Sequence, residues 1–284
     1  MYFTLTVENP RGERLTLTEY RSAYQVTYTG LGPVAASVNM SSLGMVNGEK
    51  FNSSRVGRRN IVLTVTIQGN VEANRLRLYR YFPVEETVKL YYKNGARDVY
   101  TEGVVESCEP SQFDPVQRVQ ISILCPQPYL IGAEEIVQDI SGVMNHFKFP
   151  FSIAAAGIPF SSFASSTYAV LHNDGDKSTG LIITVYARSD VLEPVVYNAV
   201  TNEAFRITGT LQAGHTLTID TSPGHKRLTI ASPAGVVTNA LHRKAVGSTW
   251  LQLATGDNYI AYSAAQYADA MLVTLRHNNL FVGV

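Results

Sequence analysis

The six histidines are the side chains with the widest chemical range, since imidazole acts as a general acid, a general base or a metal ligand near neutral pH. No two of them stand two residues apart, as on a strand, or four apart, as on a helix, so their spacing aims no pair at one ion. The chain also lacks the motifs His-Glu-x-x-His, Gly-x-Ser-x-Gly and the Walker phosphate loop. We therefore expect no enzyme, no metal site and no cofactor. The histidines are His146, His172, His215, His225, His242 and His277.

An acidic turn beside His172 resembles part of a calcium-binding loop. Asp174 and Asp176 flank a glycine, but a full loop needs further acidic positions and a bidentate Glu, whereas Lys177 follows here. Because Asn-Asp-Gly is a common turn sequence, we predict a hairpin turn at this place instead.

Cys108 and Cys125 are the only cysteines. If residues 103–109 pair with 119–125 through the intervening loop, the two cysteines fall nearly opposite each other, which would permit a cross-strand disulfide. The first residues show neither the basic nor the long apolar stretch of a signal peptide, so we expect synthesis in a cytoplasm and two reduced thiols. No stretch of about 18 apolar residues occurs, so we expect no membrane insertion.

Alternating apolar residues predict antiparallel strands in the first half of the chain. The alternation runs through 61–67 and 119–125 and places one face of each strand on a core. Residues 88–92 and 97–105 flank Asn94-Gly95, a pair that favours a type I′ hairpin turn with positive φ at both residues.

Two segments depart from this period of two. Residues 71–82 follow Asn70, which suits a helix N-cap, and precede Pro83, which stops a helix, so we predict an amphipathic helix packed on a sheet. Residues 30–60 are rich in Ser, Asn and Gly, and we predict a long irregular loop that a partner orders.

The second half has fewer charges and more frequent turns. Residues 1–140 carry 29 charged side chains and residues 141–284 carry 17. Short apolar strands alternate with turns about every ten residues and no helix interrupts them, which is typical of a β-sandwich. We therefore predict an all-β dominated chain of two β-sandwich domains, 1–135 with the helix at about 71–82, and 136–284.

Taken in order, several segments resemble the distal tail protein (Dit) family of siphophages. They cover nearly the whole chain, although no single motif is specific. The segments are 58–69, 75–83, 104–109, 119–129, 173–175, 201–209, 214–221, 250–253 and 256–262.

The resemblance implies a virion structural protein of the phage tail tip, made in the host cytoplasm. In that family a tail-tube-like N-terminal domain forms a hexameric ring, the baseplate hub, around a channel through which DNA passes. A galectin-like C-terminal domain docks baseplate or receptor-binding proteins. The implied partners are five further copies of the chain, the tail tube protein, the tail-associated tip protein and receptor-binding proteins. Some members carry an inserted carbohydrate-binding module, for which the second domain here leaves no room.

The composition agrees with a protein that is covered by partners. Lys and Arg number 23, Asp and Glu also 23, which argues against a large nucleic-acid surface. Charged residues are few and Tyr outnumbers Phe, as interfaces favour. We therefore predict that the loop 30–60 wraps a neighbouring subunit and that Arg55, Arg58 and Arg59 lie at that contact. The arginines of the helix, Arg75, Arg77 and Arg80, are either solvated with local partners such as Glu72, or line a contact or channel.

Other functions remain as alternatives. One is a carbohydrate-binding module that recognises host cell-wall glycans through the C-terminal sandwich, where Trp250, Tyr259 and Tyr262 could stack on a sugar or belong to the core. A polysaccharide hydrolase would need two carboxylates a few ångströms apart, and residues 141–284 hold only eight acidic side chains. A third alternative is a baseplate protein of a contractile or defective-prophage particle, which the sequence does not distinguish from a protein of a siphophage tail.

Overall fold

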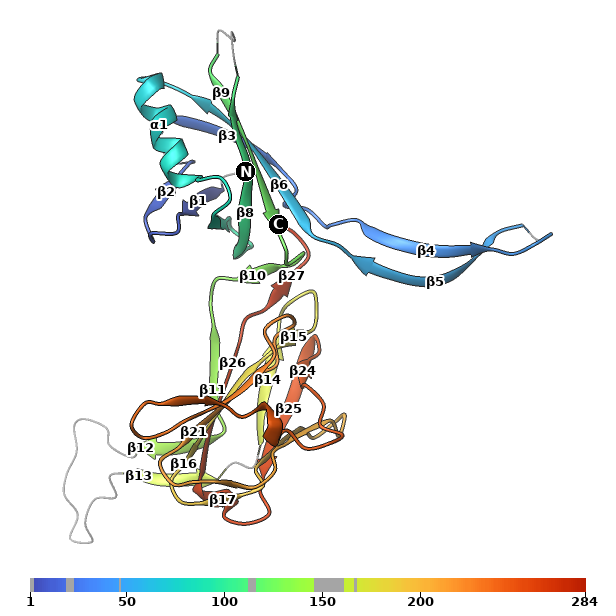
Figure 1. The fold of residues 1–284 in the computed structure, drawn as a ribbon, viewed down its shortest axis with the longest axis vertical. Coiled ribbons are helices and arrows are strands. Elements are labelled where there is room, and N and C mark those ends of the chain that lie inside the picture. The colour runs from blue at the N-terminus through green and yellow to red at the C-terminus, as the bar shows by residue number, and fades with distance from the viewer. Residues whose placement is uncertain (1–2, 19–22, 46, 112–115, 146–160, 166–167) are drawn as a thin grey trace. The chain divides into compact units, whose positions relative to one another are not determined.

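The computed structural model describes residues 3–18, 23–45, 47–111, 116–145, 161–165 and 168–284 (Figure 1). The chain divides into two compact units, 1–134 together with 280–284, and 135–279. The predicted boundary at 135/136 places the last five residues in the second domain. In the structure they complete the first unit, because Leu280 and Phe281 pair with Ile131 and Leu130.

The first unit is built on one antiparallel sheet of nine strands. Its main path runs in the order β2-β1-β7-β8-β9-β6-β3, and β10 joins β8 and β27 beside that path. The strands are β1 (Thr4–Glu8), β2 (Arg14–Thr16), β3 (Tyr24–Thr29), β6 (Arg59–Ile67), β7 (Thr87–Lys93), β8 (Asp98–Pro110), β9 (Arg118–Cys125), β10 (Leu130–Gly132) and β27 (Leu280–Phe281).

The predicted alternation and helix are both present in this unit. Alternate apolar positions of β6 and β9 are buried in one core, while most residues between them are half-buried or exposed. The helix α1 (Val71–Tyr81) begins at Asn70, whose Oδ1 accepts a hydrogen bond from the Ala73 amide at 3.3 Å. It ends one residue earlier than predicted, and Leu78 and Phe82 pack into the sheet's core.

The turn between β7 and β8 differs from the prediction. The two strands do form a hairpin, but neither Asn94 nor Gly95 has a positive φ, so the turn is not type I′. Instead, Asn94 Oδ1 accepts hydrogen bonds from the amides of Ala96 at 2.8 Å and Arg97 at 2.7 Å. The asparagine side chain thereby takes the place of the expected backbone geometry.

The segment predicted to be an irregular loop is largely a long hairpin. Strands β4 (Ala36–Ser42) and β5 (Glu49–Val56) pair with each other, with a register shift between Asn39 and Met40. Within the described residues they pair with no other strand. Figure 1 shows this hairpin extending away from the sheet of its own unit. We call residues 36–56 the arm.

The cysteines do not meet. Strands β8 and β9 pair as predicted, but Cys108 lies opposite Ile121, whereas Cys125 lies close to where a Gly103 side chain would be. Both thiols are free. Burial raises the pKa of Cys108 to about 11, which keeps this thiol protonated and unreactive near neutral pH.

The second unit contains two larger sheets that share one core. Its alternating apolar positions interleave between a six-stranded and a four-stranded sheet, and the all-β architecture predicted for the chain is confirmed. The six-stranded sheet runs β11 (Ile136–Asp139), β26 (Met271–His277), β16 (Ile182–Ala187), β21 (Thr216–Asp220), β22 (Arg227–Ala231) and β23 (Val237–Asn239). The four-stranded sheet runs β14 (Tyr168–Asn173), β25 (Gly256–Ser263), β18 (Val195–Asn198) and β19 (Ala204–Arg206).

Shorter elements complete this unit. Three strand pairs are β12 (Ser141–Asn145) with β13 (Ser161–Ser165), β15 (Thr179–Gly180) with β24 (Gln252–Leu253), and β17 (Val191–Leu192) with β20 (Thr210–Leu211). Two short 3-10 helices are η1 (Leu241–Arg243) and η2 (Ala268–Ala270). Across the described ranges, no helix is long and apolar enough to cross a membrane.

Candidate interaction surfaces

The arm presents large apolar side chains to solvent. Every described residue of 36–55 is exposed, and Met40 lies directly opposite Phe51, which keeps 58% of its surface accessible. Val38, Leu43 and Met45 are also exposed. Two paired strands without a core are marginally stable alone in water, and their outer edges carry unpaired backbone groups. The arm therefore has the properties of a segment that another surface covers.

The base of the arm is held by one buried arginine. Arg59 is only 1% exposed, and its guanidinium donates to four backbone carbonyls from three separate parts of the first unit. Nη1 donates to Gly30 at 2.6 Å and Gly32 at 2.8 Å, Nε to Pro128 at 2.8 Å, and Nη2 to Val282 at 2.8 Å. Burial lowers the pKa of Arg59, but an arginine stays protonated. Arg59 thus connects the segments on both sides of the arm to the segment that follows β9 and to the C-terminal residues.

The three arginines predicted to lie at a subunit contact therefore have different environments. Arg55 is on β5 opposite Ser37, and Arg58 lies between β5 and β6; both are exposed. Within the described part of the chain, neither forms an ion pair. Arg59 fixes the backbone at the base of the arm. It would therefore act on a subunit contact indirectly, by positioning Arg55 and Arg58. Their place at an interface stays a prediction.

The arginines of the helix have local partners. Arg75 pairs with Glu72 at 2.6 Å, which agrees with the prediction that the helix arginines are solvated and have local partners. Arg80 pairs with Glu13, and hydrogen bonding from Arg80 lowers the pKa of that carboxyl group. Arg77 lies over the Tyr81 ring at 5.9 Å.

The aromatic residues of the second unit divide between core and surface. Trp250 packs on Phe205, with 4.9 Å between ring centroids, and Tyr262 also packs against the core. Tyr259 is exposed and lies beside Tyr168, with 6.4 Å between ring centroids. Tyr168 was not singled out from the sequence, because its strand pairs with one about ninety residues further along the chain.

The predicted hairpin turn at 173–177 is a turn, but it does not join a hairpin. Strand β14 pairs with β25 rather than with the strand that follows it. Asn173 Oδ1 accepts from the Gly175 amide at 2.9 Å, and Asp174 lies 3.1 Å from His172. His172 also contacts Asp257 at 2.5 Å, and these carboxylates raise the pKa of the exposed imidazole. No cluster of three metal-binding side chains occurs among the described residues.

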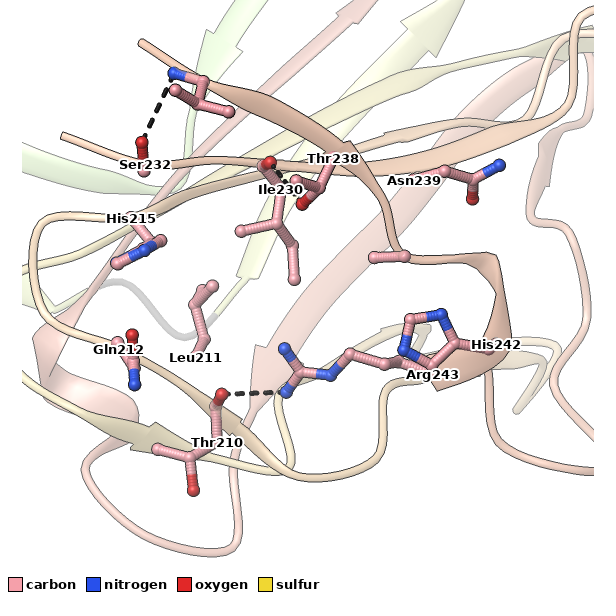
Figure 2. Close-up of a pocket in the computed structure, with 12 residues that line it drawn as sticks. Thr210, Leu211, Gln212, His215, Ile230, Ser232, Thr238, Asn239, His242 and Arg243 are labelled. Atoms are coloured by element: carbon pink, nitrogen blue, oxygen red, sulfur yellow. Dashed lines mark hydrogen bonds between the residues drawn. The ribbon is translucent and has the colours of Figure 1, made fainter. Parts of the chain in front are cut away.

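The remaining histidines have separate environments. His277 is buried, and neither ring nitrogen has a hydrogen-bond partner of good geometry among the described residues. Burial lowers its pKa and outweighs the nearby backbone of His172, which raises it. His225 lies in an exposed turn, and His146 is outside the described residues. His215 and His242 meet at one pocket together with Arg243 (Figure 2). The sequence did not reveal this proximity, because no spacing relates a residue in the turn before β21 to one on a 3-10 helix 27 positions further along the chain.

Two family models match this chain. Residues 11–125 match the phage tail protein RIFT-related domain, and residues 174–281 match the C-terminal domain of the siphovirus-type tail component. Together these matches take in well over half of the sequence. The chain belongs to the siphophage distal tail protein family. Among curated proteins no relative matches.

Solved structures of phage hub and baseplate proteins share the fold. The crystal structure of SPP1 Dit, described as a paradigm of the hub adsorption apparatus in phages that infect Gram-positive bacteria, is 14% identical with a TM-score of 0.67. That match covers 99% of this chain and 100% of SPP1 Dit. A chain of the phage p2 baseplate in its activated conformation with Ca is 8% identical with a TM-score of 0.55, covering 98% of each chain.

Family membership fixes the general role. This chain is a structural, non-enzymatic component of a phage tail and baseplate, and therefore a part of the virion. The arm and the exposed tyrosine pair are features through which such a component could contact others.

Proposed function

We propose that this protein forms a hexameric ring at the distal end of a phage tail, joining the tail tube to tip, baseplate and receptor-binding proteins. DNA would pass through the central channel. The observation that carries the proposal is the arm, whose apolar side chains and strand edges are exposed in the single chain. The number six, the tail-tube-like first domain and the galectin-like second domain come from the family resemblance.

Ring closure explains why an exposed arm persists in a folded protein. Identical subunits that contact head to tail close into a ring, and each subunit then offers one surface and receives the other. The arm would lie on the next subunit, where Met40 and Phe51 would be buried and the edges of β4 and β5 paired or covered. Arg55 and Arg58 would supply charge at that contact, where complementary charges improve orientation and specificity.

The test is the mass of the full chain in solution, measured by light scattering over a concentration series. We expect a hexamer, or a rise toward one with concentration. The double variant Met40→Ser/Phe51→Ser should shift this assembly toward monomer. At concentrations low enough for both proteins to be monomeric its thermal unfolding should match the wild type, because both side chains are exposed in the monomer. Val200→Ser, at an exposed valine of the second unit, is the control. A wild-type chain that stays monomeric at every concentration would contradict spontaneous ring formation, and an unaffected double variant would contradict the role of the arm.

A second candidate function is recognition of host cell-wall glycans through the second unit. The exposed rings of Tyr168 and Tyr259 lie side by side on the four-stranded sheet, and aromatic faces of this kind stack on sugars. Glycan-array binding that is lost in Tyr259→Ala would support it. Absence of any bound glycan at high protein concentration would count against it.

A further inference from the structure

The second unit contains an open pocket that neither function uses. Its volume is about 480 Å³, which is within the range of small-molecule sites. Leu211 and Ile230 supply an apolar part, and Gln212, His215, His242 and Arg243 supply polar side chains. Figure 2 shows the Arg243 guanidinium directed toward the space between Leu211 and Ile230, with His215 and Gln212 across from it.

Arg243 is fixed in place without being neutralised. Its Nε donates to the Thr208 carbonyl at 2.9 Å and its Nη2 to the Thr210 carbonyl at 2.8 Å. Within the described residues it forms no ion pair, and its Nη1 has no acceptor. A guanidinium held by neutral carbonyls keeps its full charge, and its remaining N–H groups can still bind an oxyanion.

The neighbouring side chains are also able to donate hydrogen bonds. His215 Nδ1 lies 3.3 Å from the Ala213 carbonyl, which leaves Nε2 for a ligand. The ring of His242 and the amide of Gln212 make no hydrogen bond with the described residues. Three other polar lining side chains already have backbone partners, since Thr238 donates to the Ile230 carbonyl, Asn239 Oδ1 accepts from the Leu241 amide and Ser232 accepts from the Val236 amide.

Among the described residues, no acidic side chain lines the pocket. The carboxylate that contacts this loop is Asp190, and its Oδ1 is engaged by the Ala213 amide at 2.8 Å. The pocket therefore combines one permanent cation with two imidazoles and a side-chain amide, and the described lining adds no carboxylate. Such a set of groups recognises a phosphate or a similar oxyanion. The described lining residues include no Trp, Tyr or Phe, so they offer no ring for stacking on a neutral sugar.

We propose that this pocket binds a phosphoryl group carried by a hydroxylated molecule, either a sugar phosphate or a polyol phosphate. Free phosphate alone would leave most of the volume unfilled, whereas a hydroxylated carrier would contact Gln212 and the apolar part formed by Leu211 and Ile230. All lining residues belong to the second unit, so the proposal is independent of ring assembly.

Saturation-transfer NMR on the full chain tests this, with glycerol 3-phosphate as the probe. We expect transfer to its carbon-bound protons, loss of that signal when inorganic phosphate is added in excess, and little transfer to glycerol alone. Glucose 1-phosphate in the same experiment distinguishes the two carriers, because the better competitor identifies the polyol or the sugar. Equal transfer to glycerol and glycerol 3-phosphate, failure of inorganic phosphate to compete, or no transfer at all would overturn the proposal.

Two variants locate the site. Arg243→Gln removes the charge, and His242→Ala removes a ring that makes no hydrogen bond with the described residues. Each should weaken binding about tenfold, as loss of one charge-assisted hydrogen bond does. His225→Ala, an exposed turn histidine outside the pocket, is the matched control and should bind like the wild type. If Arg243→Gln also lowers the unfolding temperature, His242→Ala decides. Unchanged binding in His242→Ala would place the ligand elsewhere.

Discussion

At the scale of single residues, Arg59 has the largest structural role of the side chains singled out from the sequence. Its guanidinium is buried and donates to four carbonyls in partly buried positions, so Arg59→Met would leave several of them without a protein donor. We expect the free energy of unfolding of the first unit to fall by about 3 kcal/mol, since a hydrogen bond to a charged group contributes about 1.5–3 kcal/mol and orphaned acceptors add a desolvation cost. Urea denaturation measures this loss.

Arg58→Met is the control for that experiment. Arg58 is adjacent in sequence but exposed, and surface substitutions usually change stability by less than about 0.5 kcal/mol. If both variants lose the same stability, the carbonyl contacts of Arg59 do not account for its effect. The sequence pointed to Arg55, Arg58 and Arg59 as one group because only their proximity was visible. Which of them is buried depends on loops and a C-terminal segment that meet only in the fold.

His277 makes stability depend on pH. Burial lowers its pKa in the folded state below 6.5, so the unfolded chain binds a proton more readily. Stability therefore falls as pH decreases from about 6.5 toward the folded-state value, and it is unaffected by this group at higher pH. We expect His277→Phe to reduce the drop in melting temperature of the second unit between pH 7 and pH 5. The opposite result, a steeper drop in the variant, would contradict a neutral buried ring.

His172 acts in the opposite direction. Its pKa is raised by Asp257 and Asp174. Its contribution to folding stability is therefore fully present below pH 6.5 and is lost as the pH rises through the raised pKa. His172→Asn should therefore increase the acid-induced drop. Comparing the two single variants with the double variant separates these effects.

At the scale of elements, the sequence predicted what is encoded locally. The helix at 71–81 and the strands around 61–67 and 119–125 follow from periodicity and capping within one window. The arm was missed because its strands are rich in Ser and Asn and bury neither face, so no alternation marks them. The two thiols are free, as expected, and the cross-strand disulfide that the sequence left open does not form, because Pro110 lies opposite Val119, which places Cys108 across from Ile121 rather than from Cys125.

Gly30 sets how closely the segment between β3 and the arm approaches β6. Its φ is +85°, and a side-chain carbon there would lie 1.9 Å from the Asn60 carbonyl oxygen. Gly30→Ala should therefore destabilise the first unit by more than about 2 kcal/mol, through left-handed strain and a clash with backbone. Gly12→Ala is a matched control, because Gly12 has a φ of +79° and nothing within 4 Å, so only the strain is added. If urea denaturation shows the same loss of unfolding free energy for both variants, the close approach of Gly30 to the Asn60 carbonyl does not matter for stability.

At the scale of the whole molecule, the chain passes from the first unit to the second and returns. That return could not be read from the sequence, since the last residues look like a continuation of the preceding strand. Leu280 and Phe281 form β27, Val282 accepts a hydrogen bond from Arg59, and the Val284 amide donates to the Leu31 carbonyl at 3.2 Å. Residues 280–284 thus contact the segment that leads into the arm and help to hold the arm on the first unit.

Deleting residues 280–284 should consequently weaken the first unit and leave the second intact. The deletion removes the β10 pairing, one acceptor of Arg59 and the packing of Gly283 on Gly32. In differential scanning calorimetry we expect the transition of the first unit to move to lower temperature while that of the second stays in place, since all 135–279 contacts that form its core remain. Ring assembly should weaken in the same variant, because the arm would lose the anchor that presents it. A single transition that shifts as a whole would instead show that the two units unfold cooperatively. The C-terminal residues would then couple the unfolding of both units rather than stabilise only the first.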